Sequence, residues 1–275
     1  MKKSTLLTAI IIAFVSIILA VIFVIVTSTL AHSQTTYPYK ADRPGMAIGA
    51  YNVGVHQMDY ECSANYGKYF GTTTTSITNQ FRYGAFDHLE FRGGFNIQHS
   101  DYSNVAGISN INLGAKIPII RDTAAFPAIS ITGGVVLPQA GRPEFTIDSY
   151  LKYAAISLQK SFGSVILIGN IGIMSDAHIP DGSYLVNPNT INHKAQGTYA
   201  LAVYKYYGNI GVFIETYGYY GAGSSEPYEA FDLGLAIVIK DNVSVDMSFG
   251  ASYADGLDIS FCNWGVGWLI PNKNK

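Results

Sequence analysis

The stretch Leu89-Glu90-Phe91-Arg92-Gly93-Gly94-Phe95-Asn96-Ile97-Gln98 alternates apolar residues with polar or small ones. Successive side chains of a β-strand point to opposite faces, so this stretch has one apolar face and one polar face. The same pattern recurs, in segments of roughly ten residues, from about residue 54 to the C-terminus. A tilted strand needs about 9–11 residues to cross a bilayer, whereas strands of soluble proteins average about 5–6. We therefore predict an all-β protein, an antiparallel up-and-down transmembrane barrel over residues 54–270.

The composition agrees with a sheet in a membrane. Only 13% of the 275 residues are charged, against about 25% in an ordinary soluble domain. The chain has 20 Tyr and 28 Gly, and its mean hydropathy is +0.19. With a net charge of −2, it has no basic character that would indicate a nucleic-acid partner. The partner expected instead is the lipid of an outer membrane, and the composition gives no indication of the oligomeric state.

The N-terminus has the features of an export signal. Met1-Lys2-Lys3 precedes an apolar run from Leu6 to Val26, and small residues end the region at Ala31-His32-Ser33. We expect residues 1–33 to be a signal peptide that directs the chain to the outer membrane of a Gram-negative bacterium. The apolar run is about 21 residues, longer than the usual 7–15, so an uncleaved inner-membrane anchor is an alternative. Residues 34–53 are expected to form a periplasmic segment or a plug in the barrel, and residues 271–275 a tail.

The breaks between the alternating segments are of two kinds, which predicts the topology. Gly-, Asp- and Asn-containing tight turns are expected at residues 83–88, 121–125, 161–164, 207–209 and 240–242. Longer loops are expected at residues 66–75, 99–106, 138–148, 175–197 and 221–229, with a brief one at 254–256. The two kinds alternate, as they do in outer-membrane barrels. The count gives about twelve strands, with both ends of the barrel on the tight-turn rim.

The alternation also predicts which side chains face the lumen. The charged inward-facing residues on the first four strands are Asp59, Glu61, Arg82, Glu90, Arg92 and Lys116, and Glu215, Asp232 and Asp246 are expected on the opposite wall. Both signs on neighbouring strands indicate ion pairs, because a buried charge is tolerated only when it is paired or wet. These residues are candidates for a polar lining along the path of a solute. The alternative is a structural network that braces a narrow lumen.

Two cysteines, Cys62 and Cys262, lie in the first and last predicted strands, which must pair in a closed barrel. A disulfide across the closing seam is therefore one hypothesis. Strict alternation places Cys62 with Met58 and Tyr60 but Cys262 with Asp258 and Ser260, which favours two unbonded thiols.

No pattern predicts a catalytic site, a metal site or a cofactor. The sequence has no Gly-x-Ser-x-Gly, phosphate loop, nucleotide fingerprint or His-Glu-x-x-His. His99-Ser100-Asp101 places neighbours on opposite faces of a strand, so it cannot form a catalytic triad by itself. His178, Asp181 and His193 share the longest loop, but polar loops of this composition rarely bind metal. We therefore expect a protein that is not an enzyme.

The chain resembles an outer-membrane transporter family described as the MetA-pathway of phenol degradation family. The resemblance rests on Asp42-Arg43-Pro44, Phe81-Arg82-Tyr83-Gly84, residues 89–96, Asn112-Leu113-Gly114-Ala115-Lys116 and residues 131–138, with a weaker likeness at residues 232–235. It implies a barrel that moves small molecules, hydrophobic or aromatic ones included, across the outer membrane. The function expected is thus a small-molecule channel or transporter. The alternatives are a structural or adhesive barrel that displays surface loops and an outer-membrane lipid-modifying enzyme.

Overall fold

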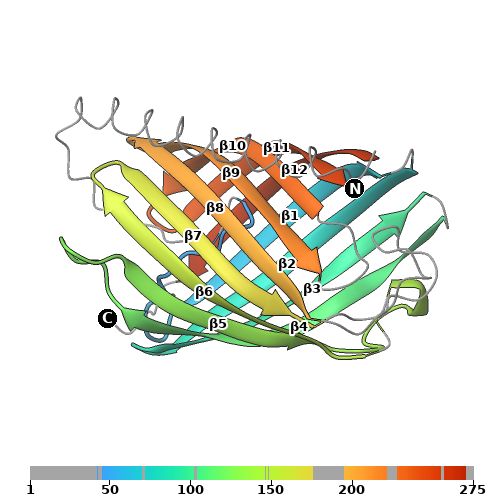
Figure 1. Ribbon diagram of the computed structural model, residues 1–275, viewed down its shortest axis with the longest axis horizontal. Coiled ribbons are helices and arrows are strands. Elements are labelled where there is room, and N and C mark those ends of the chain that lie inside the picture. The colour runs from blue at the N-terminus through green and yellow to red at the C-terminus, as the bar shows by residue number, and fades with distance from the viewer. Residues whose placement is uncertain are drawn as a thin grey trace.

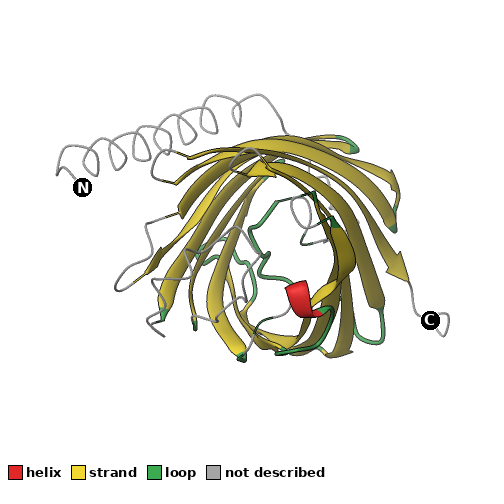
Figure 2. Cartoon of the chain, turned by 90° about the vertical axis from the view of Figure 1, so that its right-hand side faces the viewer, coloured by secondary structure: helices red, strands yellow, loops and turns green. Residues whose placement is uncertain are grey.

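A computed structural model describes residue 42 and residues 45–69, 72–101, 104–145, 147, 149–175, 195–221, 228–254 and 257–270. In these residues, twelve strands form a closed barrel in which each strand pairs antiparallel with the next and β12 closes onto β1 (Figures 1 and 2). The strands are β1 (Met58–Tyr69), β2 (Thr72–Phe86), β3 (Leu89–Ser100), β4 (Val105–Ile120), β5 (Ala128–Val136), β6 (Leu151–Phe162), β7 (Val165–Met174), β8 (Gln196–Tyr207), β9 (Ile210–Gly221), β10 (Tyr228–Lys240), β11 (Val243–Ala254) and β12 (Leu257–Ile270). A short 3-10 helix, η1 (Pro143–Phe145), lies between β5 and β6. The predicted all-β antiparallel barrel of about twelve strands is confirmed.

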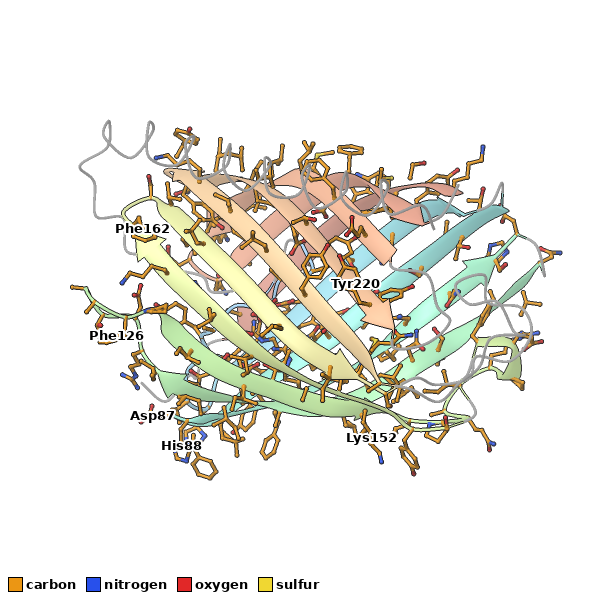
Figure 3. The ribbon with its side chains drawn as sticks, in the orientation of Figure 1. Asp87, His88, Phe126, Lys152, Phe162 and Tyr220 are labelled. Atoms are coloured by element: carbon orange, nitrogen blue, oxygen red, sulfur yellow. The ribbon has the colours of Figure 1, made fainter. Side chains whose placement is uncertain are left out.

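The tight turns lie where the sequence places them. Asp87-His88 joins β2 to β3, Gly163-Ser164 joins β6 to β7, and Gly208-Asn209 joins β8 to β9. Gly163 and Gly208 have φ of 59° and 60°, a left-handed conformation that glycine adopts without a steric cost. The ends of the barrel lie on this tight-turn rim, because Met58 pairs with both Ile270 and Tyr83. Asp87, His88, Phe126 and Phe162 mark this rim, at the left of Figure 3.

The expected long loop at residues 66–75 is wrong. The first strand continues to Tyr69 and the second begins at Thr72, with Tyr69 paired to Thr72. The threonines at 72–75 are polar and show no alternation with apolar residues. Threonine is also β-branched, and a strand that extends past the membrane keeps its pairing without an apolar face.

The outer face of the barrel is apolar and the inner face is polar. On β11, Ser244, Asp246 and Ser248 are buried while Phe249 is half exposed, as the alternation predicts. On β4 the alternation shifts at Asn110, which is exposed and has a φ of 52°. The β3–β4 register shifts at the same place, between Gly94 and Asn96. A bulge therefore removes Asn110 from the inner face, where a simple alternation would put it.

Both cysteines are free thiols, so the disulfide hypothesis is wrong. The register explains this, because Cys62 lies opposite Val266 and Cys262 lies opposite Tyr66, four residues further along the seam. Ser260, which shares a face with Cys262, is exposed and therefore does not mark an inner face. Cys262 shares its face with the half-exposed Trp264 and Trp268, so both cysteines are on the outer face of the barrel.

Several predicted features lie outside the described residues. These are the signal peptide at 1–33, the tail at 271–275 and the loop that holds His178, Asp181 and His193. Within the described residues, no helix has the length and apolar character needed to span a membrane.

The register of the closing seam is testable with an engineered disulfide. Tyr66 and Cys262 are directly opposed on the outer face, and opposed Cβ atoms lie about 4.5–5.5 Å apart, close to disulfide geometry. Tyr66→Cys, in a Cys62→Ser background, should therefore crosslink to Cys262 under oxidising conditions. The measurement is the fraction of free thiol after unfolding, with and without reductant. Ala64→Cys, opposite Trp264, is the matched control and should stay free. Crosslinking by the control but not by Tyr66→Cys would contradict the register.

Candidate functional site

The chain before β1 runs inside the barrel. We call residue 42 and residues 45–55 the luminal segment; its described part crosses the lumen in Figure 2. Nearest the tight-turn rim, the Val53 amide donates to Glu90 Oε2 on β3 at 2.7 Å. The Ala50 amide donates to Gln159 Oε1 on β6 at 2.9 Å. The segment therefore lies across the lumen between strands that do not pair with each other.

Further from the rim, the luminal segment reaches β7 and β9. The Ile48 amide donates to Asn170 Oδ1 at 2.7 Å, and Asn170 Nδ2 donates back to the Ile48 carbonyl at 2.8 Å. The Met46 amide donates to Glu215 Oε2 at 2.6 Å, and the Ala47 amide donates to Glu215 Oε1. Ala47 and Ala50 are each 1% exposed. The wall thus holds this segment through its main chain.

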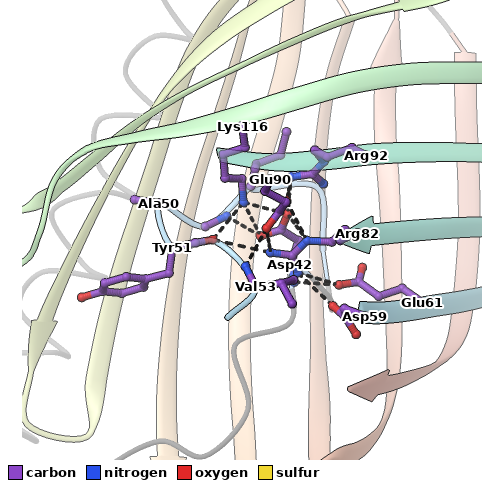
Figure 4. A network of polar contacts seen from close by, with 12 residues as sticks. Asp42, Ala50, Tyr51, Val53, Asp59, Glu61, Arg82, Glu90, Arg92 and Lys116 are labelled. Atoms are coloured by element: carbon purple, nitrogen blue, oxygen red, sulfur yellow. Dashed lines mark hydrogen bonds and ion pairs between the residues drawn. The ribbon is translucent and has the colours of Figure 1, made fainter. Parts of the chain in front are cut away.

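Arg82 is the centre of an ion-pair network on the wall formed by β1 to β4 (Figure 4). Its guanidinium is 0% exposed and donates from Nε and Nη2 to the two carboxylate oxygens of Glu90, at 3.0 and 3.1 Å. Its Nη1 donates to Asp59 at 3.0 Å and to Glu61 at 3.1 Å. A planar guanidinium with forked donors suits several carboxylates at once. The network therefore compensates a fully buried charge.

Asp42 of the luminal segment joins the same network. Its carboxylate pairs with Lys116 Nζ at 3.0 Å and with Arg92 Nη1 at 2.6 Å, and it lies 3.6 Å from Arg82 Nε. Burial alone would raise the pKa of Asp42, but the charges of these three side chains outweigh burial and hold that pKa well below its usual range. Asp42 is thus a carboxylate at every physiological pH.

Arg82 and Arg92 are directly opposite each other in the β2–β3 register. Like charges in directly opposed positions destabilise a sheet. Glu90 contacts both guanidinium groups, and Asp42 approaches both from the lumen. The segment therefore contributes a negative charge where the wall brings two positive charges together.

All nine charged residues predicted to face inward are buried: Asp59, Glu61, Arg82, Glu90, Arg92, Lys116, Glu215, Asp232 and Asp246. The structure gathers the six on β1 to β4 into one network. It separates them from Glu215, Asp232 and Asp246, which lie on β9, β10 and β11; β12 stands between β11 and β1. Whether these residues line the path of a solute stays a prediction.

An apolar patch covers the inner wall of β7 to β9. Tyr204 and Phe213 stack with their ring centroids 5.3 Å apart, and Tyr204 also stacks on Tyr206 at 6.3 Å. Ala47 of the luminal segment packs into this cluster, which also contains Ile168. The lumen therefore has a mixed-charge wall and a wall that combines aromatic rings with carboxylates.

Sequence reasoning missed Asp42, Gln159, Asn170 and Tyr204 as residues of this site. Asn170 had a visible signal, because it is the one polar side chain in the apolar run from Val165 to Met174. Asp42 belongs to the motif Asp42-Arg43-Pro44 that supports the family resemblance, but no alternation around it indicates a place in the lumen. Gln159 and Tyr204 had no signal, because their roles depend on where the luminal segment lies. The described residues contain no group of His, Cys, Asp and Glu placed to hold a metal ion.

The model of the family described as "Putative MetA-pathway of phenol degradation" matches residues 41–256. The chain belongs to this family. The match begins one residue before Asp42 and ends before β12, so in this family member it takes in the whole luminal segment and β1 to β11. A search of curated proteins by sequence gives no significant match.

Solved structures with a similar fold are barrels of the outer membrane. One is an outer-membrane channel from Pseudomonas putida F1, with 14% identity over 83% of this chain and 99% of that chain, at a TM-score of 0.60. Another is the NanC porin, with 9% identity over 75% of this chain and 98% of that chain, at a TM-score of 0.52. At these identities the likeness shows the fold, and the fold of this family member is that of an outer-membrane barrel.

Removal of the central guanidinium should destabilise the barrel. Arg82→Gln leaves Asp59, Glu61 and Glu90 buried without their shared cation, a change that typically costs about 3–5 kcal/mol. The measurement is the free energy of unfolding in denaturant, with the protein refolded into lipid vesicles. Arg142→Gln is the control, because Arg142 pairs with Glu144 in a half-exposed loop position, where an ion pair contributes about 0–1 kcal/mol. Equal stability of the two variants would contradict the central role of Arg82.

Proposed function

We propose that this protein is an outer-membrane channel for small molecules, gated by its own luminal segment. The observation that carries the proposal is a closed barrel with a polar interior that the segment crosses. A barrel of about twelve strands lies between eight-stranded barrels, which side chains fill, and sixteen-stranded porins, which hold an aqueous channel. A segment of chain inside such a lumen narrows the path that a solute can take.

The way the luminal segment is held supports a gate. It is held by hydrogen bonds of its main-chain amides and carbonyls, by the ion pairs of Asp42 and by the packing of Ala47. Its pairing with a strand is a single parallel bridge, between Val55 and Gly84 at the rim. The barrel's own hydrogen-bond ladder does not pass through the segment. Release of the segment would therefore leave the barrel closed and intact.

The inner wall supports a solute that is small and in part aromatic. Tyr204, Phe213 and Tyr206 present stacked rings next to Ile168 on one side of the lumen. Aromatic solutes gain from stacking and from the loss of water at such a surface. The six charged residues on β1 to β4 would line the same path on the other side, and Glu215, Asp232 and Asp246 would line it next to the rings. We also propose that residues 1–33 are the export signal and that the tight-turn rim faces the periplasm of a Gram-negative bacterium.

Two substitutions should open the gate by different routes. Asp42→Asn removes the charge that pairs with Lys116 and Arg92. Gly45→Ala changes no charge, but Gly45 has a φ of 97° and an added Cβ would lie 2.7 Å from Glu215 Oε2. Both variants should show a higher single-channel conductance in planar bilayers than the unmodified protein, because the segment leaves the lumen.

Asp101→Asn is the matched control, because Asp101 is exposed and pairs with His99 far from the segment. Its conductance should equal that of the unmodified protein. Equal conductance of the unmodified protein, Asp42→Asn and Gly45→Ala would contradict the gate. Silence of every variant would contradict the channel itself.

The conductance should also depend on pH in one direction. The pKa of Asp42 is held below its usual value by the neighbouring cations, so its contribution to docking is fully present above the pKa of the free side chain. That contribution is lost only as the pH falls below about 4. We therefore expect no Asp42-dependent change in conductance between pH 5 and 8 and an increase in strong acid. Asp42→Asn should remove this difference, and an increase that survives the substitution would have to come from another group.

A further inference from the structure

The wall opposite Arg82 carries two carboxylates that face each other. Glu215 on β9 and Asp232 on β10 are directly opposed in register, and they are 2% and 1% exposed. The Cβ atoms of directly opposed residues lie about 4.5–5.5 Å apart. Two buried carboxylates at this separation repel each other unless a proton or a cation lies between them. The pair therefore requires either a shared proton or a cation.

The partners of this pair supply hydrogen bonds but no charge. Glu215 accepts the main-chain amides of Met46 and Ala47, which are neutral donors. Asp232 Oδ1 is buried and has no hydrogen-bond partner. Within the described residues, neither carboxylate forms an ion pair, whereas Arg82 is paired with Asp59 of the other wall and Lys116 with Asp42 of the luminal segment. The lumen thus has one wall where the charges are matched and one where they are not.

Aromatic rings stand beside the unmatched carboxylates. Phe213 is two residues from Glu215 on the same face of β9, and it stacks on Tyr204. A Cβ placed on Gly45 would lie 2.7 Å from Glu215 Oε2 and 3.2 Å from the Tyr204 hydroxyl, so both groups border the same point of the luminal segment. Carboxylates together with aromatic faces are the surroundings that bind organic ammonium groups, through charge and through cation–π attraction.

We propose that Glu215, Asp232, Tyr204 and Phe213 form a binding site for the ammonium group of a small organic cation. The amides of Met46 and Ala47 occupy the donor positions of that cation in the closed state. The cation and the luminal segment therefore compete for Glu215. The proposal rests on the proposed channel function in one respect, since it makes organic cations a solute class of that channel.

The test compares three ligands of one shape on the full chain in detergent: benzylammonium, benzyl alcohol and benzoate. Isothermal titration should show that benzylammonium binds most tightly and that benzoate does not bind. The double variant Glu215→Gln/Asp232→Asn should lower the affinity for benzylammonium by about tenfold or more, because the ligand loses its counter-charge. Gly45→Ala should raise that affinity, because the segment no longer competes.

Glu229→Gln is the matched control, since it removes one negative charge from β10 on the outward-facing row, where Glu229 bonds Tyr220. Its affinity should equal that of the unmodified protein, and heat-dependent migration on a gel confirms that each variant is folded. Equal binding of all three ligands, or an affinity that the double variant leaves unchanged, would overturn the site. So would the absence of benzylammonium binding by both the unmodified protein and Gly45→Ala.

Conductance separates this site from the channel proposal. A barrel that binds benzylammonium through Glu215 and Asp232 but conducts in no variant keeps the site and loses the channel. A barrel that conducts but gives no charge-dependent binding keeps the channel and loses the site.

Discussion

Inside a bilayer, a backbone N–H or C=O that lacks a partner costs several kcal/mol, and a sheet avoids this cost only when it closes on itself. In this protein the closure is the pairing of β1 with β12, from Met58 opposite Ile270 to Lys68 opposite Ser260. Closure turns one face of every strand toward lipid and the other into a confined space. The inward-facing side chains must then satisfy each other, because bulk water does not surround them. The arrangement of the lumen follows from that confinement.

The two walls of the lumen meet this requirement in different ways. On β1 to β4, the guanidinium of Arg82 holds Asp59, Glu61 and Glu90. On β9 and β10, Glu215 and Asp232 have no such cation in the described structure. The luminal segment bonds to both walls, with a charged side chain on the first and with neutral amides on the second. Its docking therefore adds a compensating charge to the first wall, but it gives the second wall hydrogen bonds without charge.

The sequence predicted the parts of this structure that repeat. The alternation of apolar and polar residues recurs in every strand. It predicts the strand number, the antiparallel order, the tight turns and the inward face of all nine charged residues. It failed at single positions where the pattern is interrupted, such as the bulge at Asn110 and the seam register of Cys62. An alternation fixes which face a residue lies on but not its height along a neighbouring strand, and a disulfide requires both. For the site itself, the sequence predicted the charged residues of the wall but not the contacts of Asp42 and Asn170. Those contacts depend on the luminal segment, which carries no periodic pattern.

The composition of the luminal segment explains why it can occupy the lumen without becoming part of the barrel. Gly45, Ala47, Gly49 and Ala50 have little or no side chain that could pair with a charge. The wall accepts the main-chain amides of Ala47 and Ala50, and Asp42 of the segment itself accepts that of Gly49. An amide satisfies the hydrogen-bonding capacity of a carboxylate but leaves its charge uncompensated. A solute with a positive charge would satisfy both and would have an advantage over the segment at Glu215. The neutral main-chain amides of the segment thus keep the lumen closed. They leave Glu215 with an electrostatic preference for a positively charged solute, which could displace them.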